Sequence, residues 1–237
     1  MFERFRQRSL ELEHIDKGDY TPEEYESCLV ELRRVNRWLG DTSALRRTAL
    51  AEFERVGARE FSLLDVGAGS GELLRVVARW ARGRGAGARL VGVELNERSA
   101  RSILEESNGI AEIASVRADA LRLPFDDDAF DYCICSLFTH HFRDEGVVAV
   151  LREMARVARR RIYVIDLHRH ALAYFLYTTA GRLLLHSRLL HEDGALSILR
   201  SFAPAELQRL GEQAGLSGVK VERRFPYRLV LSGSKAR

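Results

Sequence analysis

The sequence predicts an α/β fold in which a mostly parallel sheet is covered by helices on both faces. Apolar runs of strand length alternate with segments of helical periodicity between residues 61 and 166. This alternation favours a parallel sheet, because each crossover helix returns the chain to the same end of the sheet. A further helix and two closely spaced apolar runs follow near residues 204–233. The fold class is therefore α/β, with an antiparallel pair added to the sheet.

Seven strands and four helices are expected in this part of the chain. The strands are expected at residues 61–66, 88–94, 112–118, 130–136, 161–166, 218–224 and 227–233. The helices are expected at residues 70–83, 97–107, 144–159 and 204–215. Only Phe225 and Pro226 separate the last two strands, and so short a link favours an antiparallel hairpin.

The segment before the first strand is predicted to be helical. Thr21 and Pro22 form an N-cap and first-turn pair, and apolar residues follow at helical spacing until Gly40. A second helix is expected at residues 43–56. We therefore expect a helical extension over residues 1–58.

A helical insertion is expected after the fifth strand. Residues 167–200 are too many for an ordinary connection, and their leucine and aromatic residues recur at helical spacing. The main domain is thus expected at residues 59–237, with the insertion inside it. Both helical segments are candidates for a lid over the site.

Composition limits the classes of partner and cofactor. The chain has 237 residues, which suits one α/β domain with appended elements. Its 37 basic and 34 acidic residues give a net charge of +3, so a nucleic-acid partner is not expected. Cys133 and Cys135 point to the same side of a predicted strand, and no second pair completes a zinc site. We expect buried thiols and no metal site.

No membrane segment is predicted. The first residues lack the apolar core of a signal peptide, and basic and histidine side chains interrupt residues 171–190. A membrane span needs ~20 predominantly apolar residues. We therefore expect a cytoplasmic protein. The sequence does not indicate its oligomeric state.

The most informative motif is a glycine-rich loop directly after the first predicted strand. Gly67, Gly69 and Gly71 have the spacing G-x-G-x-G, and Asp65 precedes them. A phosphate-binding loop ends in Gly-Lys-Ser/Thr, and a dinucleotide loop has the spacing G-x-G-x-x-G. Neither occurs here, and a negative charge on Asp65 would repel a pyrophosphate. The loop favours a nucleotide cofactor that carries a positive charge.

The acidic residue followed by G-x-G-x-G resembles the first motif of class I S-adenosylmethionine (SAM)-dependent methyltransferases. Glu94 after the second strand and Asp119 after the third occupy the positions of two further acidic residues of that family. Residues 123–131, Leu-Pro-Phe-Asp-Asp-Asp-Ala-Phe-Asp, resemble its entry to the fourth strand. The resemblance covers about residues 60–166 and implies a Rossmann-like fold with SAM as cofactor.

The resemblance assigns a cofactor site at the carboxyl ends of the strands. Glu94 would accept hydrogen bonds from the ribose hydroxyls, Leu95 would pack on the adenine ring, and Asp119 would meet the adenine amino group. The alternative for Glu94 is a charge near the start of the following helix. The full set of expected cofactor-binding residues is Asp65, Gly67, Ala68, Gly69, Gly71, Glu94, Leu95, Asp119, Ala120 and Ser136.

A base and an acceptor site are expected after the fourth and fifth strands. His140 and His141 lie in the loop that the family turns toward the methyl donor, and an imidazole suits proton removal near neutral pH. We favour His141 over His140 as the catalytic base, and helix capping or packing is the alternative. The residues expected on the acceptor side, for which loop solvation is the alternative, are Asp166, His168, Arg169 and Tyr174.

The same loop narrows the expected acceptor. It lacks the Asn/Asp-Pro-Pro-Tyr/Phe motif of base amino-methylating enzymes, the Pro-Cys nucleophile of cytosine-C5 enzymes and the two glutamates of protein arginine methyltransferases. The pattern looks most like bacterial methyltransferases of quinone, polyketide and other secondary metabolism. We expect O-methylation of a small apolar or aromatic metabolite. The alternatives are C-methylation, methylation of RNA or protein, SAM binding without turnover, and a nicotinamide-dependent oxidoreductase.

Overall fold

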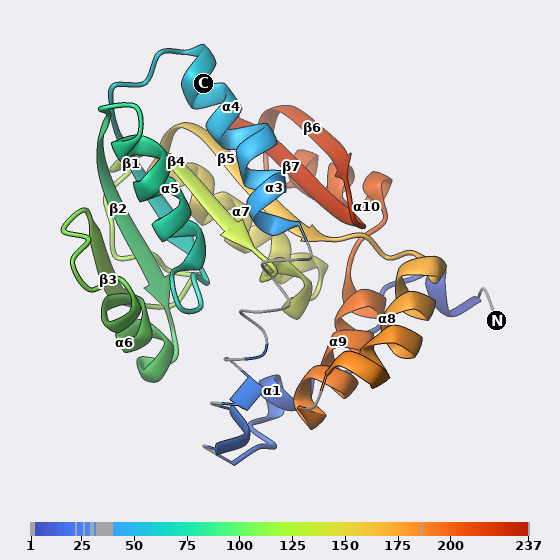
Figure 1. Cartoon of the computed structure of the whole chain (residues 1–237). Helices are drawn as coiled ribbons and strands as arrows, with labels where there is room; N and C mark the ends of the chain where they lie inside the picture. The colour runs from blue at the N-terminus through green and yellow to red at the C-terminus, as the bar shows by residue number, and fades with distance from the viewer. Residues whose placement is uncertain are drawn as a thin grey trace.

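The computed structural model describes residues 3–21, 23–25, 27, 28, 31, 40–185 and 187–236. Seven strands of the described chain form one sheet in the order β3-β2-β1-β4-β5-β7-β6 (Figure 1). The strands are β1 (Glu60–Val66), β2 (Gly87–Glu94), β3 (Ile113–Arg117), β4 (Phe130–Ser136), β5 (Ala158–Leu167), β6 (Leu216–Arg224) and β7 (Arg228–Lys235).

The first five strands are parallel, and the last two form the predicted hairpin. β1 pairs in parallel with β2 on one side and with β4 on the other, whereas β7 is antiparallel to both β5 and β6. The strand order therefore reverses between β1 and β4. In open α/β sheets, ligands bind outside the carboxyl ends of the strands at such a reversal.

Helices cover both faces of the sheet, as the alternation predicts (Figure 1). On one face lie α3 (Asp41–Leu45), η2 (Arg46–Leu50), α4 (Ala51–Arg55), α5 (Glu72–Arg82) and α6 (Glu97–Glu106). On the other lie α7 (Asp144–Val157) and α10 (Pro204–Gln213). The run from α3 to α4 confirms the helix expected at residues 43–56, with a π-helical stretch in its middle.

Aromatic packing anchors this helical run to the sheet. Phe53 of α4 is fully buried, and its ring centroid lies 4.0 Å from that of Tyr132 in β4. Burial of a phenylalanine side chain contributes about 1.5–3 kcal/mol. At the other end of the run, Arg228 of β7 and Asp41 form a buried ion pair, with Nε and Oδ1 2.5 Å apart.

The boundary between α7 and β5 differs from the prediction. The helix expected at residues 144–159 ends at Val157, and the strand begins at Ala158 instead of residue 161. Arg159 Nη2 and Arg160 Nε lie 2.6 Å and 3.1 Å from Oδ1 of Asp131 on the neighbouring strand. These ion pairs to β4 stabilise a strand that begins with basic residues. A hydrophobic pattern does not predict such a strand start.

The insertion is helical, as expected, and forms α8 (Ala171–Leu184) and α9 (Arg188–Arg200). Figure 1 shows both helices to one side of the sheet, next to the N-terminal segment, residues 3–17, which contains α1 (His14–Lys17). Asp193 of α9 accepts hydrogen bonds from the backbone N–H groups of His14 and Ile15.

Most of the helix expected between Thr21 and Gly40 lies outside the described residues, so it stays a prediction. Among the helices that are described, none combines the length and the apolar character that crossing a membrane requires.

Candidate active site

The glycine loop between β1 and α5 has backbone conformations that favour glycine. Gly67 has φ +68°, and a Cβ added there would lie 2.5 Å from the ring of Phe138. Gly69 has φ +57°, but the space beside it is open. A ligand can therefore approach the backbone at Gly69, while Gly67 allows the loop after β4 to pack closely against this turn.

Two acidic side chains lie at this loop with little compensation for their charge. Asp65 is 2% exposed, its Oδ1 has no hydrogen-bond partner among the described residues, and burial, with a contribution from Glu94, raises its pKa well above the usual range. Burial also raises the pKa of Glu94 to about 7, although Glu94 Oε1 accepts the Gly69 N–H at 2.5 Å. The ionised form expected for Asp65 is thus favoured only when a positive charge lies nearby. A cationic cofactor would supply this positive charge, so Asp65 and Glu94 fit a cofactor of that kind.

The remaining expected cofactor residues gather at neighbouring strand ends. Leu95, just after β2, is 64% exposed and offers an apolar surface. Asp119 follows β3, is exposed, and accepts the Leu121 N–H at 2.9 Å, whereas Ala120 is buried. Ser136 ends β4 and is half-buried. The strand ends therefore bring together residues that are far apart in the sequence, while the contacts of each with a cofactor stay predictions.

His140 and Asp166 form a buried pair beyond the ends of β4 and β5. His140 lies in the short helix η3 (Thr139–His141), and its Nδ1 is 2.7 Å from Asp166 Oδ1. The Asp166 Oδ2 accepts the Thr139 hydroxyl at 2.6 Å and the His140 N–H at 3.1 Å. Burial alone would raise the pKa of Asp166, but His140 and these hydrogen bonds hold it at about 2. The ionised carboxylate favours the tautomer with hydrogen on Nδ1, which leaves Nε2 as a proton acceptor.

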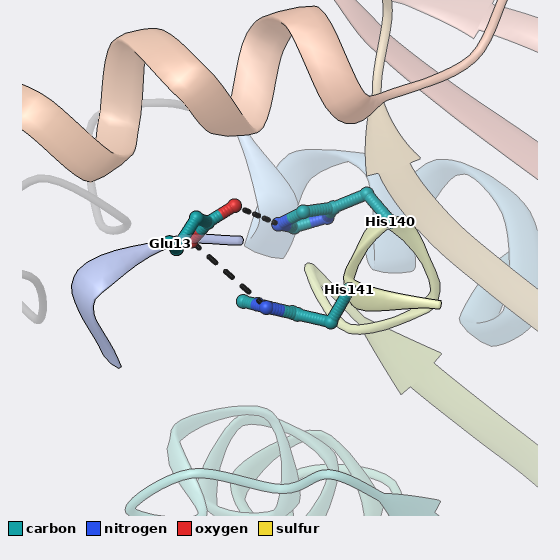
Figure 2. Close-up of side chains that lie close together, drawn as sticks. All are labelled: Glu13, His140 and His141. Carbon is teal, nitrogen blue, oxygen red and sulfur yellow. Dashed lines mark ion pairs between the residues drawn. The ribbon is translucent and has the colours of Figure 1, made fainter. Parts of the chain in front are cut away.

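His141 faces two acids of the N-terminal segment. Its Nδ1 lies 2.8 Å from Asp16 Oδ1 and 3.9 Å from Glu13 Oε2. Figure 2 shows that Glu13 points toward both imidazoles, and Glu13 Oε1 is 3.8 Å from His140 Nε2. Burial raises the pKa of Glu13 to about 7. Sequence reasoning missed Glu13 and Asp16, because no local motif signals that this segment folds against a loop so far along the chain.

Buried arginines hold the N-terminal segment against the loop after β4. Arg200 Nε donates to the His140 carbonyl at 3.2 Å, and its Nη2 donates to the His141 carbonyl at 2.5 Å. Arg8 Nη2 donates to the Phe142 carbonyl at 2.9 Å, and its Nη1 lies 2.8 Å from Asp144. The position of the two histidines therefore depends on the N-terminal segment and α9.

The four residues expected on the acceptor side do not form one group. Asp166 pairs with His140. The buried guanidinium of Arg169 donates to the carbonyls of Ser201 at 2.6 Å and Phe5 at 3.0 Å and bonds Glu206 at 2.6 Å, so it is engaged in structure here. The Tyr174 ring packs edge-on against Phe5, with centroids 5.6 Å apart.

His168 lies at a separate cavity of about 320 Å³. Burial, aided by His170 and two arginines, lowers its pKa to about 4, so the imidazole is neutral at pH 7. The cavity is lined by His168, His170, Arg223, Arg224, Phe225, Tyr227 and Arg228. A second cavity, of about 450 Å³, lies between α3 and the β6–β7 turn. Neither is lined by a glycine-loop residue.

The reversed strand order, the glycine loop and the acids at the strand ends define a class I SAM-dependent methyltransferase domain. A family model described as a methyltransferase domain matches residues 64–173, and this segment belongs to that family. SAM is the cofactor of the class.

Two curated relatives match part of the chain. An uncharacterized methyltransferase, YcgJ, from Bacillus subtilis is 29% identical over 111 residues, which are 45% of this chain and 41% of the relative. A demethylmenaquinone methyltransferase from Roseiflexus castenholzii is 37% identical over 101 residues, 40% of this chain and 37% of the relative. The chain thus spans about two fifths of the length of these relatives.

Solved structures share the fold over more of the chain. A SAM-dependent methyltransferase from Aquifex aeolicus has 19% identity and a TM-score of 0.56, covering 83% of this chain and 95% of its own. Magnesium protoporphyrin IX methyltransferase from Synechocystis, with bound SAH, has 17% identity and a TM-score of 0.58, and the match covers 83% of this chain and 84% of that protein. The CurJ carbon methyltransferase has 11% identity and a TM-score of 0.68, and the match covers 94% of this chain and 63% of that protein. At these identities the likeness concerns the fold.

Proposed function

We propose that the protein transfers the methyl group of SAM to a small apolar or aromatic metabolite, at an oxygen atom. The observation that carries the proposal is the His140–Asp166 pair, a buried imidazole with an orienting carboxylate, which supports an acceptor that must lose a proton. An acceptor hydroxyl must lose a proton, and an imidazole held in one tautomer is suited to take it. His141 lies near enough to Glu94 to influence its pKa, which links the histidines to the predicted cofactor side.

Bound SAM would supply an electrophilic methyl group on a positively charged sulfur. Asp65 and Glu94 would bind and orient the cofactor through their carboxylates. His140 or His141 would hold the acceptor proton: Asp166 orients His140, whereas the greater exposure of the His141 side chain favours His141. Alignment of the two reactants can contribute much of the rate enhancement, because it removes the entropic cost of their encounter.

C-methylation of a similar metabolite is the second candidate. It is supported by the Roseiflexus relative, which is named for demethylmenaquinone, and by the fold shared with the CurJ carbon methyltransferase. A carbon acceptor such as an enolised ring also needs a proton acceptor, so the two histidines serve either reaction. Nuclear magnetic resonance of the methylated product distinguishes O-methyl from C-methyl.

The first test is calorimetric titration with SAM and its demethylated product. Absence of binding at millimolar concentration contradicts the proposal.

The second test incubates the protein with labelled SAM and cell extract, then separates small molecules, RNA and protein. Label in a small molecule supports the proposal, label in macromolecules favours the other acceptor classes, and binding with no label identifies a SAM-binding protein without turnover. Titration with NAD(H) in place of SAM tests the oxidoreductase alternative.

A further inference from the structure

Three side chains that can ligate metal converge where the N-terminal segment meets the loop after β4. Glu13, His140 and His141 each offer one ligand atom, and these atoms all lie within 4.8 Å of one another. The side chains of Glu13 and His140 are both 3% exposed. Figure 2 shows the carboxylate directed toward the two imidazoles.

The spacing of these atoms is too wide for direct hydrogen bonds. Glu13 Oε1 and His140 Nε2 are 3.8 Å apart, and Glu13 Oε2 and His141 Nδ1 are 3.9 Å apart. Ligand atoms that share a tetrahedral ion lie roughly 3.4 Å apart, given metal–ligand bonds of about 2.0–2.2 Å. A small inward movement of the side chains would therefore bring all three within bonding distance of one ion.

Two of the ligands already have supporting hydrogen bonds. Asp166 lies 2.7 Å from His140 Nδ1, which directs the lone pair of Nε2 toward Glu13. The Ser197 hydroxyl donates to Glu13 Oε1 at 2.9 Å. Histidines that bind metal almost always donate their second ring N–H to a carboxylate, carbonyl or water, which fixes the ring and increases its basicity. The His140–Asp166 pair has this arrangement.

The charges around the cluster also favour a cation. The carboxylates of Glu13, Asp16 and Asp166 surround the two imidazoles, and Arg200 contacts the first two, with Nε 3.6 Å from Glu13 and Nη1 3.2 Å from Asp16. The guanidinium of Arg8 is paired with Asp144. Even without Glu13, the two carboxylates of Asp16 and Asp166 outnumber the one guanidinium of Arg200 beside the cluster, and a divalent ion would neutralise the excess.

We propose that Glu13, His140 and His141 bind a divalent first-row transition-metal ion. Imidazole with carboxylate suits Zn²⁺ or Fe²⁺, whereas Mg²⁺ and Ca²⁺ favour ligand sets made of oxygen atoms. Asp16, whose Oδ1 is 2.8 Å from His141 Nδ1, is the nearest candidate for a fourth ligand. No metal site was predicted from the sequence, because only the cysteines were considered. Glu13 was not considered with the two histidines, because it is remote from them along the chain.

The metal site goes beyond the proposed methyl transfer and does not depend on it. If both hold, the ion occupies the imidazole nitrogens that would otherwise accept the proton. An acceptor hydroxyl bound to the ion would then lose its proton to solvent water more readily, because a bound cation stabilises the oxyanion.

The test is calorimetric titration of the chelator-treated, full-length protein with Zn²⁺, without SAM or acceptor, and an absorption spectrum with Co²⁺ as a second probe. We expect one ion per chain. Glu13→Gln, which keeps the side-chain shape, and His141→Ala should each weaken binding by more than ~10-fold, and Asp166→Asn by ~10–100-fold. Circular dichroism confirms that each variant is folded.

His170→Ala is the matched control, since His170 belongs to the other histidine pair, with its ring centroid 5.4 Å from that of His168. Zn²⁺ affinity should be unchanged in this variant. The proposal is overturned if the wild-type protein binds no stoichiometric ion, if folded Glu13→Gln binds as tightly as wild type, or if His170→Ala loses as much affinity as His141→Ala. Because turnover is not measured, failure of methyl transfer does not alter this result.

Discussion

Glu94 is a half-buried carboxylate at the end of β2, and it connects the glycine loop to the proposed ribose site. Its Oε1 accepts the Gly69 N–H. We expect Glu94→Ala to weaken SAM binding by about 1–3 kcal/mol, because hydrogen-bonding groups buried with the cofactor would lose a charged acceptor. Calorimetry measures the affinity, with the exposed Glu105→Ala on α6 as the control. Equal affinities for wild type and Glu94→Ala would remove Glu94 from the site.

The same carboxylate predicts a pH dependence of stability without cofactor. Its folded-state pKa is raised from 4.5 to about 7 by burial, so Glu94 stabilises the fold below pH ~4.5, and this contribution is lost as the pH rises through ~7. The loss is a few kcal/mol at most, at about 1.4 kcal/mol per pKa unit. Urea unfolding of Glu94→Gln should show a smaller decrease in stability between these pH values. An unchanged slope would show that Glu94 is not the group responsible.

Asp166 provides a prediction specific to the proposed base. In Asp166→Asn the carboxylate that holds His140 in one tautomer is lost, so His140 presents a free Nε2 lone pair to the acceptor proton less often. The maximal rate should fall by ~10²-fold, in the range typical of general-base contributions. Rates are measured with metal chelated, so that the imidazoles are free. If His141→Ala lowers the rate and Asp166→Asn leaves the rate unchanged, His141 is the base.

At the residue scale, the residues expected to bind the cofactor lie at neighbouring strand ends, whereas those expected on the acceptor side do not form one group. Asp65 precedes the last residue of β1, Glu94 ends β2 and Asp119 follows β3, and parallel strands carry such residues to one edge whatever their neighbours are. Arg169 is different, because the carbonyl groups that bind its guanidinium come from a distant segment. Glu13 is different for the same reason. Sequence periodicity contains no information about pairings of that kind.

Among the elements, the N-terminal segment is held by contacts with residues far along the chain. Asp193 of α9 accepts the N–H groups of His14 at 2.8 Å and Ile15 at 3.1 Å. We expect Asp193→Ala to increase hydrogen exchange at these two amides, because the free energy of local opening falls when their acceptor is removed. Mass spectrometry of peptides covering the segment measures this. Glu145→Ala, an exposed change on α7, should leave exchange there unchanged; equal protection in Asp193→Ala would contradict the contact.

Element types were predicted well, and boundaries less well. The glycine spacing, the strand alternation and the short link at Phe225 and Pro226 are local signals, and the structure confirms the elements they predict. The start of β5 was wrong by three residues, because basic side chains there form ion pairs with Asp131 instead of extending a helix.

For the whole molecule, stability depends on the contact between the helical run from α3 to α4 and the sheet. Phe53 is fully buried and packs on Phe61, Trp80, Tyr132 and Tyr163. Phe53→Ala should lower the free energy of unfolding by about 3–5 kcal/mol, measured by urea denaturation. Phe225→Ala, at a side chain that is 88% exposed, should change it by less than ~0.5 kcal/mol. Similar losses in both variants would contradict this assignment of the core.

The arginine contacts of the N-terminal segment have a consequence for biosynthesis. Arg8 donates to the carbonyl of Arg200, which lies 192 residues later in the chain, and both side chains hold the loop that carries His140. A ribosome must therefore translate past residue 200 before these contacts can form. Until then the loop that carries His140 lacks these contacts. The contacts that hold the His140 and His141 loop therefore form late, after most of the chain has been synthesised.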